Sequence, residues 1–375
     1  MSTTLNTTNV ALISLQNLCD NASVLSSNIH GFLSENGYNI VESLEDAGTI
    51  VINTCVFDDT KKHKDESFVD NIVSSYPAKK VVVVGCLPNT TKKFANMNNV
   101  IMVGTGEMDK LYRIFRNDVR FGSFVVKPDS SSLMGVIGMS GDYSPVQIST
   151  GCSNNCSYCA IKTAKGHVKS RSIDDIKKYI RLLLERGENR IFLISDDCGS
   201  YGMDIGTNIS ELVDVILSMN GGIKMKIYSM YPALFVKHYP SLRKHFANKR
   251  INHIGVPLQS GSSRILKLMN RSYDIDEIKS LVRDLKECNP EAKVISNIIY
   301  NFPTETMDDF KKSVKASMIF DYSLFFRYCE TTGSKSSYIY PKCGDADSKK
   351  KSVILNKMIA RGKVRGSIAS HGIHN

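Results

Sequence analysis

The run Gly151-Cys152-Ser153-Asn154-Asn155-Cys156-Ser157-Tyr158-Cys159 decides the fold of the second half of this 375-residue chain. It follows an apolar-alternating stretch, Val146-Gln147-Ile148-Ser149, which predicts a strand. Three thiolates spaced C-x3-C-x2-C can hold three irons of a [4Fe–4S] cubane and leave the fourth iron without a protein ligand. Such an open iron can chelate S-adenosylmethionine (SAM), whose reductive cleavage gives a 5′-deoxyadenosyl radical. Structural zinc is the first alternative, but it needs four ligands, usually from two C-x2-C pairs.

The composition argues against a membrane protein and against a secreted one. The chain has no apolar run of about 18 residues. Its first residues, Met1 to Leu5, lack the charged and apolar regions of a signal peptide. Ten cysteines without a signal indicate a reducing, cytoplasmic compartment, where cysteines serve metals and redox chemistry. The formal net charge of +11 suits a polyanionic partner through non-specific attraction.

The first 122 residues alternate buried-strand patterns with helical ones, which predicts a small parallel α/β domain. The predicted strands are Val10–Ile13, Thr49–Ile52, Val81–Val84 and Val100–Val103, and the helices are Asp59–Ser75 and Glu107–Arg116. A turn-rich linker is expected over 123–143, around Lys127-Pro128-Asp129-Ser130-Ser131-Ser132.

The alternation resumes over 144–343 and predicts six βα units, a partial or full parallel (β/α)6 barrel. Beyond the strand at Val146, strands are expected at 190–195, 223–229, 252–257, 293–299 and 323–328, and helices near 173–187, 208–218, 275–288 and 306–319. The cysteine run follows the first strand, at the end where barrels carry their chemistry. Residues 344–375 are expected to form a basic tail with a short helix in its middle and a disordered end.

A second set of cysteines follows three strands of the first domain. Cys55 and Cys86 each end a buried strand, and Cys19 lies between the first strand and a helix. Carboxyl ends of parallel strands share one edge of a sheet, so the three thiols can converge on a second cluster with an open iron. The alternative is that they are ordinary buried small residues.

Taken together, these motifs resemble the radical-SAM methylthiotransferases, which insert sulfur and then a methyl group at unactivated C–H bonds. The resemblance covers residues 8 to 340 and is strongest to the archaeal and eukaryotic branch that acts on N6-threonylcarbamoyladenosine in tRNA. The matching motifs are Asn53-Thr54-Cys55, Gly85-Cys86, Lys162-Thr163-Ala164-Lys165-Gly166-His167, Asp196 to Asn208, Val256 to Gly261, Met269-Asn270-Arg271 and Phe302 to Thr306.

The resemblance implies SAM and two [4Fe–4S] clusters, one on Cys152, Cys156 and Cys159 and the other on Cys19, Cys55 and Cys86. It also implies tRNA as partner, an electron donor such as flavodoxin or ferredoxin, and a sulfur donor. The expected reaction adds a methylthio group at C2 of N6-threonylcarbamoyladenosine at position 37 of tRNA. A protein or peptide substrate is one alternative, and a degenerate, non-catalytic RNA- or partner-binding homologue is the other.

Several positions depart from the family pattern. Leu18, Ala22 and Leu25 replace the usual residues around Cys19, where only the cysteine and Ser26 match. Asn297, Asn301 and Thr304 stand where the family favours Asp, Gly and Gly. The family's C-terminal TRAM β-barrel has no counterpart in the 32 residues after Cys343.

The family pattern also suggests cofactor contacts. Tyr158 would lie beside the SAM adenine, and Asp196 and Asp197 near the SAM amino acid or ribose. Gln259 and Ser260 could donate to the SAM carboxylate or ribose, or could be satisfied loop residues. The neighbouring Gly199 and Gly202 are expected to let backbone approach a ligand rather than merely form turns.

Basic residues suggest where a substrate would bind. Arg271 is expected to contact substrate or the SAM carboxylate, with a surface ion pair as the alternative. Lys162, Lys165, Lys169 and Arg171 form a basic ridge expected to follow an RNA backbone, with a solvated charge run as the alternative. The last 32 residues, with seven Lys or Arg and two Asp, would add to phosphate binding or only to solubility. Glu305 is expected to cap the helix beginning at Thr306.

Overall fold

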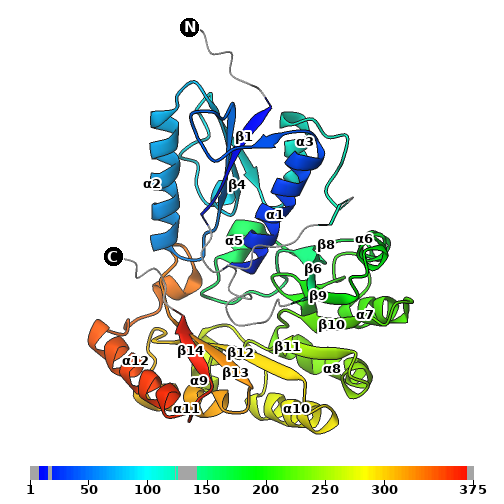
Figure 1. Ribbon diagram of the computed structural model, residues 1–375. Helices are drawn as coiled ribbons and strands as arrows, with labels where there is room; N and C mark the ends of the chain where they lie inside the picture. Colours follow the sequence, from blue (N-terminus) through cyan, green and yellow to red (C-terminus); the bar gives the residue numbers. More distant parts are fainter. Residues whose placement is uncertain (1–7, 16–18, 123, 126–141, 370–375) are drawn as a thin grey trace. The chain divides into compact units, whose positions relative to one another are not determined.

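The computed structural model describes residues 8–15, 19–122, 124–125 and 142–369 (Figure 1). The chain divides into two compact units, Met1–Cys152 with Ala160–Glu188, and Ser153–Cys159 with Asn189–Asn375. Most of the linker predicted at 123–143 lies outside the described residues. Within the described part, no helix has the length and apolar character needed to cross a membrane.

The first unit contains the parallel sheet that the sequence predicts, with strand order β2-β1-β3-β4-β5. Its elements are β1 (Asn9–Ser14), α1 (Asp20–Glu35), β2 (Asn39–Ile40), β3 (Thr49–Thr54), α2 (Asp59–Ser75), β4 (Lys80–Gly85), η1 (Leu87–Asn89), β5 (Val100–Gly104), η2 (Met108–Lys110) and α3 (Leu111–Ile114). Only the two-residue β2 has no counterpart among the predicted strands.

Both faces of this sheet are buried, which explains why its strands are continuous apolar runs. Ile50 and Ile52 of β3 belong to one apolar cluster, whereas Val51 between them belongs to the cluster on the other face. Val81 and Val82 of β4 divide in the same way. Alternate side chains of a strand point to opposite faces, so each face of the sheet packs against its own apolar cluster.

The rest of the first unit surrounds the cysteine run in sequence. It comprises β6 (Ser144–Gln147), β7 (Ser149–Thr150), α5 (Ile161–Lys165), β8 (Lys169–Ser170) and α6 (Ile173–Glu185). β7 and β8 pair antiparallel. α5 packs on η1, because Ala164 is buried in the core of the N-terminal sheet and Asn89 Nδ2 donates to its carbonyl at 2.6 Å.

The second unit contains parallel strands in the order β14-β13-β12-β11-β10-β9, with α7, α8, α10 and α11 outside them (Figure 1). Its elements are β9 (Arg190–Ile194), η3 (Cys198–Ser200), α7 (Ile209–Ser218), β10 (Lys224–Ile227), α8 (Pro232–Ala247), β11 (Ile251–Gly255), α9 (Ser263–Leu268), α10 (Ile275–Cys288), β12 (Lys293–Tyr300), α11 (Met307–Ser317), β13 (Tyr322–Arg327), η4 (Lys335–Tyr338), α12 (Asp345–Ala360) and β14 (Gly366–Ala369). This curved parallel α/β arrangement confirms the predicted fold class.

The basic C-terminal segment differs from the expected tail. α12 has 16 residues, and β14 then pairs parallel with β13, so the segment up to residue 369 is part of the sheet. Lys351 of α12 is 1% exposed, because it forms an ion pair inside the unit. The prediction of a disordered end was therefore wrong for 366–369, while residues 370–375 lie outside the described part.

Candidate functional site: two cysteine centres

The Thr54-Cys55 and Gly85-Cys86 motifs interlock at the carboxyl edge of the first sheet. Gly85 has φ +101°, and a Cβ there would lie 2.3 Å from the Thr54 carbonyl oxygen, so only glycine fits. The Cys86 amide donates to that carbonyl at 3.2 Å, and the Leu87 amide donates to the Thr54 hydroxyl, also at 3.2 Å. These contacts hold the two strand ends, and hence Cys55 and Cys86, side by side.

Asn53 brings the third cysteine to the same edge. Its Nδ2 donates to the Ala22 carbonyl at 2.8 Å and to the Ser26 hydroxyl at 2.6 Å, both on α1. Cys19 is the N-cap residue of that helix, so Asn53 fixes the helix end that carries it. Ser26 is the one neighbour of Cys19 that matches the family pattern, and this hydrogen bond gives a physical reason for it.

The Cys55 thiol is within hydrogen-bonding reach of both Cys19 and Cys86. A hydrogen bond from Cys55 lowers the pKa of Cys19, an effect opposed by burial and reinforced by the positive charge of Lys165. Hydrogen bonds with Cys19 and Cys86, together with burial, raise the pKa of Cys55 well above its usual range. The convergence predicted from topology is therefore present. None of these three cysteines forms a disulfide bond in the described structure.

Among the described residues, no three His, Cys, Asp or Glu side chains are arranged to hold a single metal ion. In a cubane each thiolate binds a different iron, so its cysteines are set farther apart than the ligands of one ion. Each set offers three thiols rather than the four of a closed cluster, which fits a cluster with one open iron.

The cysteine run begins at a tight turn in the first unit. Gly151 has φ +76°, and a Cβ there would lie 2.2 Å from the His167 carbonyl oxygen. The Cys152 amide donates to the Gly166 carbonyl at 3.3 Å. Glycine is therefore required immediately before the first cysteine.

The remainder of the run, 153–159, is held by the C-terminal end of α9 in the second unit. The Ser157 amide donates to the Met269 carbonyl at 2.9 Å, and its hydroxyl donates to the Leu268 carbonyl at 2.8 Å. Asn270 Nδ2 donates to the Asn155 carbonyl at 2.7 Å. This accounts for the Met269-Asn270-Arg271 motif, whose backbone and amide clamp the loop.

Arg271 lies beneath the cysteine loop rather than on an exposed substrate surface. It is 5% exposed, and its Nη1 donates to Cys156 Sγ and to the Tyr158 hydroxyl, each at 3.3 Å. Its Nη2 donates to the Pro257 carbonyl at 2.7 Å. The guanidinium thus places a positive charge beside a cysteine sulfur of the predicted cluster loop.

Three tyrosines enclose this arginine. The guanidinium lies 4.5 Å from the ring centroid of Tyr231 and 5.5 Å from that of Tyr273. Burial raises the pKa of Tyr158 well above its usual range, so this tyrosine stays neutral. Its ring meets Phe302 edge-on at 6.3 Å. The cysteine motif marks Tyr158 in the sequence, whereas no motif marks Tyr231 or Tyr273.

The Asp197 carboxylate is fully engaged in hydrogen bonds that hold neighbouring loops together, which argues against its predicted contact with SAM. Its Oδ1 accepts the amides of Gly199 at 3.1 Å and Tyr231 at 2.9 Å. Its Oδ2 accepts Asn154 Nδ2 and the Ser200 hydroxyl, both at 2.6 Å. Burial raises the pKa of Asp197, and these donors lower it. The carboxylate therefore ties the cysteine loop to the end of β9.

Asp196, by contrast, is half-buried and its predicted cofactor contact remains a prediction. The two nearby glycines pack closely against neighbouring residues. A Cβ on Gly199 would lie 2.7 Å from Leu234 Cβ on α8, and Gly202, with φ +84°, turns against the Thr207 carbonyl. This packing accounts for both glycines, and their expected role beside a ligand stays a prediction.

Gln259 and Ser260 differ in their availability for a ligand. Gln259 has φ +66°, rare for a non-glycine residue, and its buried Oε1 has no hydrogen-bond partner among the described residues. Ser260 is fully buried, and its hydroxyl contacts Ser313 at 3.1 Å and accepts the Ser262 amide. Gln259 thus fits a cofactor contact, whereas Ser260 is one of the satisfied loop residues.

The loop after β12 explains two departures from the family pattern and corrects one expectation. Asn301 has φ +65° and Thr304 φ +68°, the left-handed backbone that glycine, which the family favours here, adopts freely. Glu305 does not cap α11, since Thr306 is the N-cap residue and forms a capping box with Asp309. Glu305 is instead buried and paired with Lys351 of α12 at 2.7 Å.

Only some side chains of the predicted basic ridge are exposed and available to a ligand. Arg171 donates to the carbonyls of Gln147 at 3.0 Å and Asp175 at 3.3 Å, and it stacks on Tyr179, so it supports the fold. Lys165 is half-buried and acts on the Cys19 thiol, as described above. Lys169 is exposed and Lys162 half-buried, so these two remain candidates for phosphate contacts.

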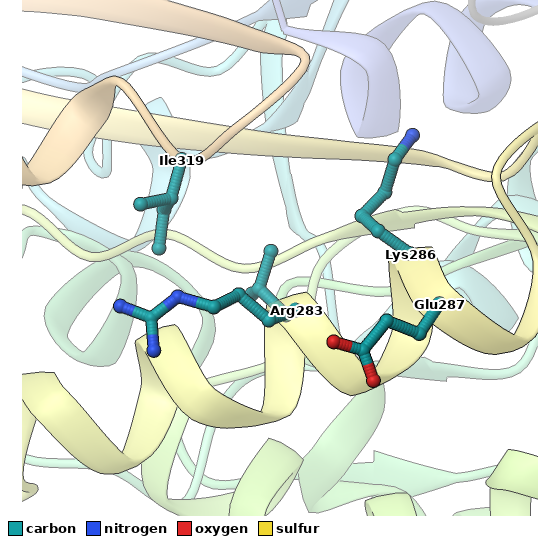
Figure 2. A pocket seen from close by; sticks show the side chains of 5 residues that line it. Arg283, Lys286, Glu287 and Ile319 are labelled. Carbon is teal, nitrogen blue, oxygen red and sulfur yellow. The ribbon is translucent and has the colours of Figure 1, made fainter.

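A surface hollow of about 330 Å³ lies beside α10, where Arg283, Lys286 and Glu287 face Ile319 (Figure 2). Lys286 is engaged with Asp321 at 3.0 Å. None of the lining residues belongs to a cysteine run or to a strand's carboxyl end, so the hollow is not assigned to the site.

Two family models match the chain. "Radical SAM superfamily" matches residues 146–316, and "Uncharacterized protein family UPF0004" matches residues 16–104. The probable threonylcarbamoyladenosine tRNA methylthiotransferase of Pyrococcus horikoshii is 28% identical over 286 residues, covering 74% of this chain and 67% of that protein. The ribosomal protein uS12 methylthiotransferase RimO of Thermotoga maritima is 30% identical over 323 residues, covering 81% and 73% respectively.

Among solved structures, the radical S-adenosylmethionine methyltransferase TsrM of Kitasatospora setae has a TM-score of 0.58 at 13% identity. The match covers 85% of this chain and 72% of that one, and it supports the fold. The matched regions contain both cysteine sets. On this evidence, the chain belongs to the radical-SAM methylthiotransferase family.

Proposed function

We propose that this protein adds a methylthio group to C2 of N6-threonylcarbamoyladenosine at position 37 of tRNA. The observation that carries the chemistry is the contact of the Cys55 thiol with both Cys19 and Cys86, in a chain that also has a C-x3-C-x2-C loop. Two centres with three thiols each match a reaction that needs one site for SAM cleavage and one for sulfur transfer. The degenerate, non-catalytic alternative loses support for one reason. The neighbours of Cys19 depart most from the family pattern, yet Cys19 still contacts Cys55.

The residues of the chain divide the work between the two centres. Cys152, Cys156 and Cys159 would hold the cluster that cleaves SAM, and the other three would hold the sulfur-carrying cluster. When bound, the clusters supply electron transfer and sulfur. Arg271 orients Cys156 through its N–H···S bond, and Asp197 and Asn270 fix the loop from either side. The unpartnered Gln259 Oε1 would accept a hydrogen bond from SAM.

The choice of tRNA rests on the branch resemblance and on charge. The motifs at 162–167 and 196–208 resemble the threonylcarbamoyladenosine branch. The net charge is +11, and α12 exposes basic side chains at Lys349, Lys350 and Lys357. Such a surface attracts an RNA backbone. A protein substrate is the second candidate, because the RimO relative shares 30% identity over 323 residues.

Mass spectrometry decides between the two substrates. Cells with and without this protein would be compared for thiomethylated nucleosides in tRNA digests and for methylthio-modified peptides of ribosomal protein uS12. We expect a methylthio-threonylcarbamoyladenosine signal that disappears when the protein is removed or replaced by its Cys156→Ala variant. A modified peptide with unchanged tRNA would overturn the tRNA assignment and leave the chemistry intact.

A further inference from the structure

Two tyrosines near the C-terminus of the second unit are unusually exposed. Tyr338 is 75% exposed and Tyr340 is 72% exposed, the highest values among the large hydrophobic side chains described. Within the described part of the chain, the Tyr338 ring stacks on no other aromatic ring and on no cation, and its backbone closes η4. Two aromatic rings left in water within three residues call for a partner that covers them.

A single extended residue separates the two tyrosines. Ile339 between them is extended, with φ −89° and ψ 128°. In extended chain, alternate residues share one side and lie about 6.6 Å apart. Both rings are exposed, so a base can stack on either of them. A flat aromatic ligand therefore fits this pair better than an aliphatic one.

The same segment is fixed to the cysteine loop. The Ser336 amide donates to the Ser157 carbonyl at 2.9 Å, and the Ser336 hydroxyl accepts the Tyr328 hydroxyl, also at 2.9 Å. Ser336 is fully buried, whereas Tyr338, two residues later, is exposed. Two residues span at most about 7 Å, so the backbone of Tyr338 lies close to the loop between Cys156 and Cys159.

Two lysines belong to the same segment as the rings, and one of them is paired with a glutamate. Lys342 Nζ lies 5.0 Å from the Tyr340 ring centroid and is held there by Glu330 at 2.6 Å and by the carbonyls of Ser336 and Ser337. Lys335 in the same segment is exposed. The segment continues into α12, whose exposed lysines have already been described. Aromatic rings among cations are the usual platform for unpaired nucleotides.

We infer that Tyr338 and Tyr340 form a stacking platform for unpaired bases of the RNA substrate, beside the SAM-cleaving centre. The inference rests on the proposed tRNA function and deepens it. It assigns recognition of a single-stranded loop to residues that no family motif contains, and it assigns phosphate attraction to the neighbouring lysines.

Anisotropy titrations with the reconstituted protein test the platform. The probes are a fluorescently labelled anticodon stem-loop RNA and a fully paired RNA duplex of equal length. Tyr338→Ala and Tyr340→Ala should each weaken stem-loop binding by roughly 5- to 150-fold, since stacking is worth about 1–3 kcal/mol per base. Tyr338→Phe and Tyr340→Phe should bind within about twofold of wild type, because the ring is kept.

Two controls separate stacking from other effects. Duplex affinity should be the same for all variants, since paired bases cannot reach the rings. Val353→Ala, an exposed apolar residue on α12, should leave stem-loop binding unchanged. Stem-loop affinities equal to wild type in both Ala variants would overturn the platform while leaving tRNA as substrate. Failure of the wild-type protein to bind either RNA at low salt would overturn both the platform and the tRNA assignment.

Discussion

Replacing Lys351 by Met should destabilise the second unit strongly. The Lys351 side chain is 2% exposed and that of Glu305 is fully buried, with Nζ and Oε2 2.7 Å apart. Nζ also donates to the Glu305 carbonyl at 3.2 Å and to Asn301 Oδ1 at 3.4 Å. Removing one partner of a buried ion pair leaves the other charge uncompensated, which costs about 3–5 kcal/mol.

The effect should depend on pH in a definite direction. Burial raises the pKa of Glu305, and Lys351 and the Asn301 amide partly offset that rise. Without Lys351 the folded-state pKa rises further, so the folded state binds the proton more tightly than the unfolded chain does. Stability is then retained at acidic pH and lost as pH rises through the folded-state pKa. The destabilisation caused by Lys351→Met should therefore be largest near pH 7 and should shrink on acidification.

Urea unfolding of the anaerobically reconstituted protein, followed by circular dichroism at pH 7 and at an acidic pH, measures this destabilisation. Lys350→Met is the matched control, because Lys350 is the exposed neighbour of Lys351 on the same helix, where changes stay within about 0.5 kcal/mol. Glu305→Gln combined with Lys351→Met should recover most of the stability, since no buried charge remains. Equal midpoints for Lys351→Met and Lys350→Met would refute the assigned role of the pair.

Three further outcomes are expected. Thr304→Gly should stabilise the protein by about 1 kcal/mol in the same unfolding assay, because relief of the backbone strain at φ +68° (about 1–3 kcal/mol) exceeds the entropic cost of glycine. Thr304→Ala keeps the strained backbone, so this variant should not be stabilised. Cys156→Ala should abolish deoxyadenosine release, whereas Cys55→Ala should keep it and form no methylthio product; normal product from Cys55→Ala would contradict the division of labour. Replacing Lys349, Lys350 and Lys357 by glutamine should reduce the slope of log K for tRNA against log salt by about 0.7–0.9 for each phosphate that is no longer neutralised. An unchanged slope would show that α12 does not contact the tRNA backbone.

The sheets were predictable from sequence because strands buried on both faces have continuous apolar runs, as in Val81–Val84. α8 was missed because Pro240 interrupts its pattern, although Phe235, Tyr239 and Phe246 are buried along it. The placement of Cys19, Cys55 and Cys86 at one edge of the first sheet was predictable, since topology alone brings the carboxyl ends of parallel strands together. The roles of Asp197 and Arg271 were not, because the residue type indicates charge, whereas their hydrogen-bond partners come from loops distant in sequence.

The C-terminal segment shows why composition alone cannot assign a role to a basic residue. Its seven cations look alike in sequence, yet Lys351 is buried in an ion pair and Lys349 and Lys350 beside it are exposed. Deleting residues 345–375 would remove β14 from β13 and leave Glu305 without its partner, so weaker RNA binding would follow from disrupted structure. Neutralising only exposed lysines keeps the Glu305–Lys351 pair and the strand. It therefore separates what the segment contributes to the fold from what its charge contributes to binding RNA.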